Sequence, residues 1–480
     1  MNGSDPNEKH SGQIRNSGLH FEGSNDMTQQ SITEAFGEFI EGFSAADLTA
    51  DQTQKIKWFF LDWLASAIAG GEEKPVRIIL KLIAGMGGTC EASVIANRTR
   101  SASLWAAMAN GAASHVVEMD DLHRESILHP AAAIIPAVFA AAESRNASGN
   151  QLIAGIAAGY EIGIRVALAA GPEHYRCWHT TATCGTFGAA AGAAIILNLP
   201  KEQISSALGS AGTQAAGLWE FLTDNAMSKQ LHTAKAAFNG LLSALLAADG
   251  FTGARRILEG QKGFLAATAG DSDIEPCLAG LGKIFHFERN SLKQHASCGH
   301  THSAIDAVLA ATEGRPMAAG SVQSVRVKVY RAAVDLLGNV SPDSPYLAKF
   351  HLPFCIATAL CYGSAGLADF TAARLKDSGL IEVMARIEIS NDPELDHCYP
   401  RMWPARVEIE TTAGEKLSAA VDCPRGDPEN FPTDLEILSK FDRLTKGLLS
   451  ARNAARIKQM VGQLESIEDV ATILNPAASN

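Results

Sequence analysis

Apolar residues recur at intervals of three and four between residue 31 and about residue 288, which is the spacing of a helix face. The segment Thr49-Ala50-Asp51 offers a cap ahead of the first long pattern. Alanine and other small residues dominate most of the patterns that follow, which favours buried, closely packed helices. The predicted helices span residues 52–68, 101–115, 131–143, 150–170, 186–197 and 234–249.

The period changes to two after about Gly320. Val325, Val327 and Val329 alternate with polar residues, as in a half-buried strand. Residues 387–389, 407–411 and 417–421 repeat the alternation, and Gly414 marks a hairpin turn between the last two stretches. A helix over residues 354–375 is predicted among these strands, and a helical pattern returns from Thr433.

These patterns predict a mainly α protein, with a large all-helical domain and an inserted smaller α+β domain. The chain has 480 residues, which is too long for one ordinary core. We expect a disordered N-terminal tail over residues 1–27, the first part of the helical domain over 28–289 and the α+β domain over 290–424. C-terminal helices over 425–480 would complete the helical domain, and a cleft between the two domains would be a natural site.

Composition narrows the class of protein. Hydrophobic residues make up 46% of the chain, enough for a large core, and the net charge of −12 makes nucleic-acid binding a poor fit. The nine cysteines form no CxxC pair and resemble reduced thiols rather than a disulfide framework. The chain has neither an uninterrupted apolar run of about 18 residues nor a secretory leader pattern. We therefore expect a cytoplasmic protein that binds neither nucleic acid nor a membrane.

The densest polar cluster lies in a nearly apolar setting between two predicted helices. It contains Glu118, Asp120, Asp121, His123 and His129. A carboxylate beside a histidine holds the imidazole tautomer and tunes its pKa, as acid/base catalysis requires. A charged, solvated loop and a metal site are the alternatives, although the spacing matches no strong zinc signature such as HExxH.

Three further segments carry candidate groups. His179 precedes a run of threonines that could cap a helix, Lys229 could bind a carboxylate, and Lys293, Cys298 and His300 fall close together at the expected domain junction. The competing interpretations are a capping loop, a surface lysine, and a buried cysteine or an incomplete Cys/His metal site. The sequence contains no GxGxxG after a strand, no Walker loop and no GxSxG elbow, which argues against common nucleotide-dependent enzymes and α/β-hydrolases.

Taken together and in their order along the chain, these four polar segments resemble the MmgE/PrpD family. The resemblance covers nearly the whole chain from about residue 31. The most specific parts are NGAASHVVEMDDLHRESILHP at 110–130, KQHASCGHTHSAIDA at 293–307 and KFHLPFCIATAL at 349–360. The family includes 2-methylcitrate dehydratase, cis-aconitate decarboxylase and iminodisuccinate epimerase. The resemblance implies a helical domain with an α+β lid, a homodimer, and no metal or organic cofactor.

The resemblance also implies roles for individual residues. It points to His129, His179, Lys229 and Lys293 with the acidic segment 118–121, whereas the role of His123 depends on the cluster alone. Three positions depart from decarboxylase-like members, namely Glu118 for Asp, Cys298 for His and Phe354 for Tyr. The predicted catalytic residues are His129, His179, Asp121, His123 and Lys293, and the predicted substrate-binding residues are Glu118, Asp120, Lys229, Cys298 and His300, with Asp121 orienting His123 or His129.

The expected reaction removes a proton from, or delivers one to, the substrate next to a carboxylate. The leading prediction is a cofactor-free lyase for a di- or tricarboxylate that dehydrates a 2-methylcitrate-like hydroxy acid. Epimerisation of an iminodisuccinate-like dicarboxylate and cis-aconitate-type decarboxylation are the alternatives within the family. A non-catalytic carboxylate-binding relative and a metal-dependent hydrolase are alternatives from other classes.

Overall fold

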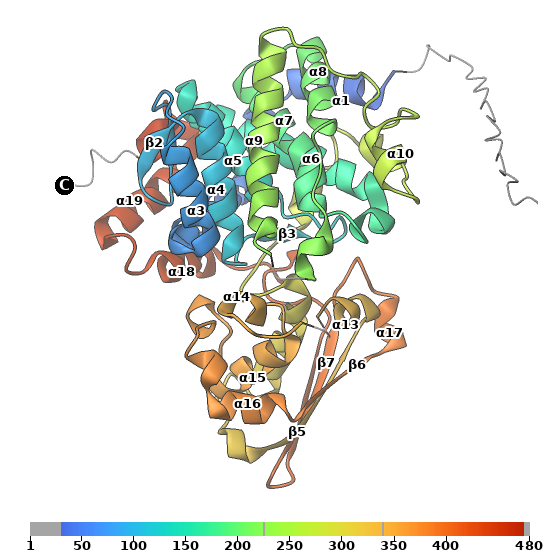
Figure 1. Cartoon of the computed structure of the whole chain (residues 1–480), viewed down its shortest axis with the longest axis vertical. Coiled ribbons are helices and arrows are strands. Elements are labelled where there is room, and N and C mark those ends of the chain that lie inside the picture. Colours follow the sequence, from blue (N-terminus) through green and yellow to red (C-terminus); the bar gives the residue numbers. More distant parts are fainter. Residues whose placement is uncertain (1–29, 224–225, 338–339, 475–480) are drawn as a thin grey trace, which may run out of the picture. The chain divides into compact units, whose positions relative to one another are not determined.

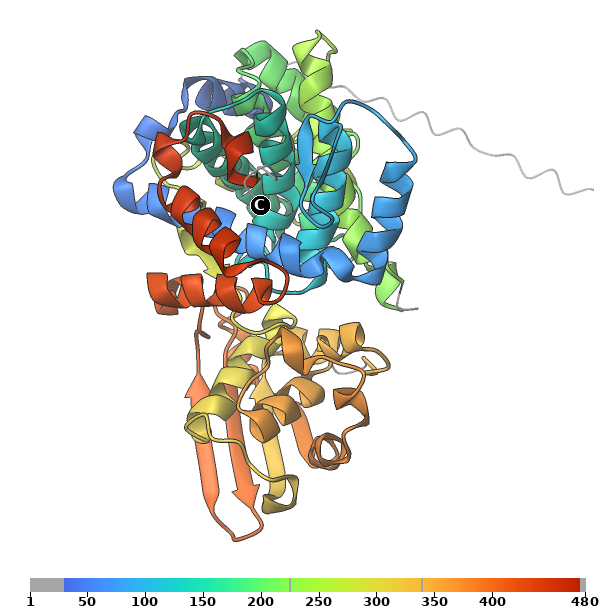
Figure 2. The same cartoon turned by 90° about the vertical axis from the view of Figure 1, so that its left-hand side faces the viewer.

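A computed structural model describes residues 30–223, 226–337 and 340–474. The expected disordered tail, residues 1–27, lies outside the described residues. From Ser31 onward the chain forms one compact unit. It is mainly helical with small sheets, as the hydrophobic pattern predicts (Figures 1 and 2).

Long helices form most of the chain up to residue 289. Their most extensive contacts join α6 to α7, α7 to α9, α4 to α9 and α5 to α7. The helices of this part are α1 (Ile32–Gly42), α2 (Ala50–Ala69), α3 (Lys74–Ala84), α4 (Ser103–Val116), α5 (Pro130–Ser144), α6 (Gly149–Tyr175), α7 (Thr180–Ile196), α8 (Lys201–Gly212), α9 (Ser228–Ala248), α10 (Phe264–Thr268) and α11 (Glu275–Leu278).

Glycines allow α6 and α7 to touch backbone to backbone. A Cβ atom on Gly188 would lie 2.6 Å from the carbonyl oxygen of Gly159, closer than the packing of real side chains permits. The prediction of closely packed helices is thus confirmed. Helix α6 is long and apolar enough to cross a membrane, but 94% of its most apolar stretch is buried inside the fold.

Several details of the helical prediction were wrong. Helix α7 begins at Thr180 rather than at residue 186, and helix α9 begins at Ser228 rather than at residue 234. The supposedly all-helical part also contains the strands β1 (Ala92–Val94), β2 (Thr99–Ser101) and β3 (Asp121–His123). Strands of three residues are too short to produce a recognisable alternation of apolar and polar positions. Strand β3 is nonetheless important, because it pairs in antiparallel fashion with β4 (Asn290–Leu292).

The predicted alternating segments form one four-stranded sheet in the order β6-β5-β7-β8. Its strands are β5 (Val322–Val329), β6 (Ile387–Asn391), β7 (Ala405–Thr411) and β8 (Lys416–Val421). Strand β6 is parallel to β5, and the other two pairings are antiparallel. The alternation in β5 is confirmed, because Val325, Val327 and Val329 are all buried.

Short helices accompany this sheet, and two helices follow it. The helix expected over 354–375 ends early, because Gly363 adopts a left-handed conformation (φ 67°) that stops it. Helix α12 packs on β7 and β8, whereas α18 and α19, red in Figure 2, pack against α2. The helices are α12 (His302–Ala311), α13 (Arg331–Leu337), α14 (Pro345–Ala348), α15 (Leu352–Tyr362), α16 (Ser378–Met384), α17 (Pro393–Asp396), α18 (Asp434–Thr445) and α19 (Ala451–Gly462).

Candidate active site

A tight turn between α4 and β3 forms the centre of the site. Glu118 adopts a left-handed conformation (φ 57°), which a residue with a side chain rarely takes unless its surroundings enforce it. Two buried lysines supply that constraint on the backbone. Lys349 donates to the carbonyl oxygen of Val117 at 2.8 Å, and Lys440 donates to that of Met119 at 2.7 Å. The carbonyl groups on both sides of Glu118 are therefore fixed.

Two more buried lysines bind the side chain of Glu118. Lys229, in the first turn of α9, pairs with one carboxylate oxygen. Lys293, which follows β4, lies 3.0 Å from the other oxygen and 3.5 Å from Asp120. Burial alone would raise the pKa of Glu118, but the two ammonium groups hold it well below its usual range. The carboxylates of Glu118 and Asp120 in turn raise the pKa of Lys293 despite its burial.

The site has a surplus of positive charge. The four lysines around the turn face three buried carboxylates, those of Glu118, Asp120 and Asp62, the last paired with Lys440 at 2.5 Å. Burial lowers the pKa of Lys349 to about 8, so that its charge remains largely present at neutral pH. This surplus favours an anionic ligand.

Asp120 connects two imidazoles. Its Oδ2 atom lies 2.7 Å from Nδ1 of His115 and 3.3 Å from Nδ1 of His129, and all three groups are buried or nearly so. Burial opposes ionisation of Asp120, but His115 and Lys293 hold its pKa well below the ordinary value. Asp120 is therefore a carboxylate that can orient two histidines.

The carboxylate of Asp121 has different partners from that of Asp120. It accepts hydrogen bonds from Tyr160 at 2.7 Å, Asn290 at 2.6 Å and the backbone of Ala131 at 2.9 Å. Burial raises its pKa to about 7. The prediction that Asp121 orients His123 or His129 through its carboxylate was wrong. Its carboxylate instead fixes the start of α5 and the β3–β4 pair, whereas Asp120 contacts His129.

The tautomer of His129 follows from its backbone contact. Its Nδ1 atom lies 2.6 Å from the carbonyl oxygen of Asp121, which can only accept, so that Nδ1 carries the hydrogen. Burial lowers the pKa of His129 to about 4, and therefore the ring is neutral at pH 7. Its Nε2 atom is then an unprotonated base in a residue that lines the pocket.

His179 forms a second group of imidazoles at the start of α7. Its Nδ1 atom lies 3.1 Å from Nδ1 of His232, and its ring stacks against His115 with centroids 5.7 Å apart. Trp219 covers the ring with a centroid distance of 4.6 Å. Burial, reinforced by His232, holds the pKa of His179 well below its ordinary value. His115 thus lies between His129 and His179.

A pocket of about 510 Å³ opens beside these groups. His300 stacks on Trp403 with centroids 4.1 Å apart and shares a hydrogen bond of 2.5 Å with the hydroxyl group of Tyr330. Burial raises the pKa of the Cys298 thiol, so that this group is an uncharged part of the wall. The lining residues are Glu118, Leu122, Ile127, His129, Tyr175, Trp219, Leu222, Lys229, Lys293, Cys298, Gly299, His300, Leu336, Val340, Phe350 and Trp403.

The structure brings most of the predicted site residues together. Glu118, His129, Lys229, Lys293, Cys298 and His300 line the pocket, and Asp120 and His179 contact groups of the same cluster. His123 does not join them, because its Nδ1 atom binds Ser126 at 2.8 Å and its ring faces His286. Within β3, Leu122 lines the pocket, whereas its neighbours Asp121 and His123 do not, since neighbouring residues of a strand point to opposite sides.

Several residues of the site were absent from the predicted set. His115, His232, Tyr346, Lys349 and Lys440 all contact it. His115 occurs in the same polar segment as Glu118, while Lys349 opens one of the segments that carry the family resemblance. Lys440 has no signal of this kind in the sequence.

Two groups of side chains have the spacing of metal ligands. The ligating atoms of His115, Asp120 and His129 lie within 4.8 Å of one another, as do those of Cys423, Asp427 and Glu429. A cationic side chain already occupies each neighbourhood, because Lys293 contacts Asp120 and Arg124 pairs with both Asp427 and Glu429. Both groups are therefore poorly suited to a divalent ion.

Comparison with known proteins identifies the family. Residues 34–277 match the MmgE/PrpD N-terminal domain, and residues 295–466 match the MmgE/PrpD C-terminal domain. The chain belongs to the MmgE/PrpD family.

Similar proteins are known in fungi and in humans. The cis-aconitate decarboxylase-like protein oryM of Aspergillus oryzae is 28% identical over 92% of this chain and 96% of its own length. A cis-aconitate decarboxylase of Aspergillus terreus is 26% identical over 93% and 98% of the two chains. The human cis-aconitate decarboxylase is 22% identical over 93% and 94%.

Proposed function

We propose that this protein is a lyase that acts on a di- or tricarboxylate and generates carbanion character beside a carboxylate. The observation that carries the proposal is the position of Lys229 and Lys293 next to the neutral imidazole of His129. Ammonium groups stabilise the charge that develops on an enolate-like intermediate, and an imidazole moves the proton. The first candidate reaction is decarboxylation of a cis-aconitate-like substrate, because the relatives named above are decarboxylases or similar to them.

In this reaction the bond between the substrate carbon and one carboxylate breaks, and CO₂ leaves. The electron pair stays on the substrate, where Lys229 and Lys293 stabilise it through the remaining carboxylates. A histidine then delivers a proton to carbon. The anionic substrate itself favours the imidazolium form of His129, since a nearby negative charge raises the pKa of an imidazole. The products are CO₂ and, from cis-aconitate, 2-methylenesuccinate.

Dehydration of a 2-methylcitrate-like hydroxy acid is the second candidate. It is favoured by the lowered pKa of His129, about 4, which leaves Nε2 ready to accept a proton at pH 7. In that reaction Nε2 takes the proton from carbon, the carbon–oxygen bond breaks, and the hydroxyl group leaves as water after protonation. The lysines would have the same role in both reactions.

Proton NMR in deuterated water distinguishes the candidates. The full chain would be incubated separately with cis-aconitate, 2-methylcitrate and iminodisuccinate. Decarboxylation yields 2-methylenesuccinate carrying deuterium from the solvent, whereas dehydration yields an alkene without loss of carbon. Exchange or inversion alone would indicate an epimerase. Absence of turnover and of deuterium exchange with all three would contradict the proposal.

Variants connect the activity to the proposed groups. Lys229→Met should raise KM by about tenfold or more, since it removes a charge-assisted contact to a carboxylate. His129→Gln should lower kcat by about 100-fold or more, since it removes the proton-transfer group. Lys235→Met is a matched control, because this lysine lies on the same helix and its ammonium group donates to Gln214 rather than to the site.

A further inference from the structure

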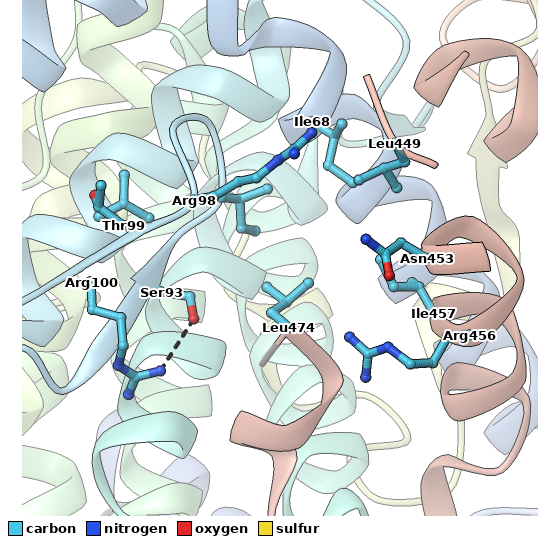
Figure 3. Close-up of a pocket in the computed structure, with 12 residues that line it drawn as sticks. Ile68, Ser93, Arg98, Thr99, Arg100, Leu449, Asn453, Arg456, Ile457 and Leu474 are labelled. Carbon is cyan, nitrogen blue, oxygen red and sulfur yellow. Dashed lines mark hydrogen bonds between the residues drawn. The ribbon is translucent and has the colours of Figure 1, made fainter. Parts of the chain in front are cut away.

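A second pocket lies between the β1–β2 hairpin and α19, and it shares no lining residue with the candidate active site. Figure 3 shows side chains from the hairpin on one side and from α19 and the C-terminal segment on the other. Its volume is about 650 Å³. The lining residues are Ile68, Ser93, Val94, Ile95, Arg98, Thr99, Arg100, Leu449, Asn453, Arg456, Ile457 and Leu474.

Three arginines give this pocket a positive charge. Arg98 donates to the carbonyl oxygen of Leu448, and Arg456 donates to the carbonyl oxygens of Thr472 and Ile473, both at 3.0 Å. These acceptors are neutral. Within residues 30–223, 226–337 and 340–474, no carboxylate forms an ion pair with either guanidinium group. Their charges are therefore not compensated by the part of the chain that the structure describes.

The third arginine has one acidic neighbour. Arg100 lies 3.3 Å from Glu143, whose pKa is raised by burial and whose carboxylate also accepts two hydrogen bonds from Ser93. Among the described residues, the ion pairs of these three guanidinium groups thus comprise one carboxylate, that of Glu143 on Arg100. In addition, the Nε atom of Arg456 is buried and has no hydrogen-bond partner. A buried donor without a partner costs free energy that an anionic ligand would recover.

The rest of the lining is aliphatic. Ile68, Val94, Ile95, Leu449, Ile457 and Leu474 contribute hydrocarbon surface, and the lining contains no aromatic ring. Aliphatic walls favour a hydrocarbon chain through burial of apolar area, whereas the planar base of a nucleotide would gain more from aromatic stacking. Guanidinium groups match carboxylate and phosphate oxygens in geometry and charge.

We propose that this pocket is a binding site for a small aliphatic anion, a hydrocarbon chain that carries a carboxylate or phosphate head group. The head group binds Arg98 of the hairpin and Arg456 of α19, and the chain lies over Ile457 and Leu474. The proposal does not depend on the reaction at the candidate active site.

Isothermal titration calorimetry of the full chain tests the site with octanoate, octyl phosphate, 1-octanol and inorganic phosphate. Octanoate or octyl phosphate should bind at least about tenfold more tightly than octanol or inorganic phosphate, because only these two use both parts of the pocket. The tighter of the two identifies the preferred head group. If neither octanoate nor octyl phosphate bound more tightly than octanol, the anionic part of the proposal would be overturned, and equal affinity for octyl phosphate and inorganic phosphate would overturn the aliphatic part.

Variants locate the binding. Arg98→Gln should weaken the tighter ligand by about tenfold, whereas Arg315→Gln, which changes an exposed arginine paired with Glu313, should leave its affinity unchanged. Leu449→Gln, at a half-buried position, should weaken it by about fivefold through loss of apolar contact. Lys229→Met should leave the affinity for this ligand unchanged, because Lys229 lines the candidate active site and not this pocket. Equal affinities in Arg98→Gln and Arg315→Gln, or loss of binding only in Lys229→Met, would overturn the proposal.

Discussion

The Nδ1 atom of His115 lies 2.7 Å from Oδ2 of Asp120, and both side chains are completely buried. The same oxygen lies 3.3 Å from His129, so that one carboxylate contacts two rings whose centroids are 5.0 Å apart. The ring of His115 also stacks on His179. Asp120 can therefore orient the imidazoles of the site as one group.

This relationship predicts the effect of Asp120→Asn. The variant keeps the shape of the side chain but loses its charge, so that His115 and His129 lose their common orienting partner. We expect kcat to fall by about 100-fold or more, with a KM change of less than about threefold, because the lysines remain. Steady-state kinetics on the substrate found by NMR measures both constants.

Asp121→Asn is the matched control, because its carboxylate contacts Tyr160, Asn290 and Ala131 instead of an imidazole. The amide oxygen of asparagine can replace only one of the two carboxylate oxygens, that which accepts from Tyr160 and Asn290 or that which accepts from Ala131. The lost contact is structural, and so kcat should stay within about fivefold of the wild type. If Asp121→Asn lost more activity than Asp120→Asn, the assignment of the orienting carboxylate would be contradicted.

Removal of both lysines that pair with the carboxylate of Glu118 should destabilise the fold. Lys229→Met/Lys293→Met leaves a buried carboxylate without a cationic partner, and the expected loss in the free energy of unfolding is about 3–5 kcal/mol. Each single variant should cost less than half of this, since one lysine still pairs with Glu118. Urea denaturation followed by circular dichroism provides the measurement. Adding Glu118→Gln to the double variant should restore most of the lost stability, and failure to do so would disprove the charge argument.

The pKa of Asp121 predicts how stability depends on pH. Its folded value of about 7 lies above the ordinary value, because burial disfavours the charged form. Stability is therefore highest below the unfolded pKa of about 4 and is lost as pH rises towards 7. Asp121→Asn removes this titration, so that the variant should gain about 2 kcal/mol or more relative to the wild type between pH 4 and pH 8. A constant difference across this range, in urea titrations at each pH, would refute the prediction.

The buried histidines have the opposite effect on how stability depends on pH. Burial lowers the pKa of His129 to about 4 and that of His300 to about 3, both below the unfolded value of about 6.5. The stability associated with these neutral rings is present above pH 6.5 and is lost as pH falls through 4 and 3. His300→Gln should therefore flatten the acid limb of the stability curve, whereas an exposed control, His397→Gln, should not.

The hydrophobic pattern predicted most of the fold but not the short strands. Helix α2 and its cap Thr49 were correct, as were the alternating strands β5 to β8, because each is long enough to show its period. The pair β3–β4 was missed, since three residues form no pattern and their partner lies far along the chain. Helix α15 ended earlier than expected because Gly363 terminates it. The apolar residues that follow Gly363 made the predicted helix too long.

The candidate site was predicted as a set of residue types rather than as a geometry. The density of acids and histidines around Glu118 was visible in the sequence, and so were Lys229 and Lys293. The different contacts of Asp120 and Asp121 were not, because Asp120 precedes β3 and Asp121 begins it, and the direction of each side chain depends on the backbone conformation at this point. The contribution of Lys440 was also hidden, since an isolated lysine in an amphipathic helix normally faces solvent.

Lys440→Met should therefore have a large effect on stability. Its ammonium group pairs with the buried Asp62 and donates to the carbonyl oxygen of Met119. Loss of this group leaves Asp62 unpaired, with an expected cost of about 3–5 kcal/mol. Lys446→Met, at an exposed position close by, should change the melting temperature by less than about 1 °C. Asp62→Asn/Lys440→Met should be more stable than Lys440→Met alone.

The contact between Lys440 and Met119 also has a consequence for synthesis of the protein. Met119, in the turn that holds Glu118, precedes Lys440 by 321 residues, and Lys440 is one of the two lysines that fix the backbone of this turn. The helices α4 to α9 can pack while the ribosome is still translating, since their contacts are with one another. A nascent chain that stalls before α18 would then carry folded helices without a finished active-site turn. Catalytic competence would appear only after α18 has been translated, so that products truncated before α18 would be inactive.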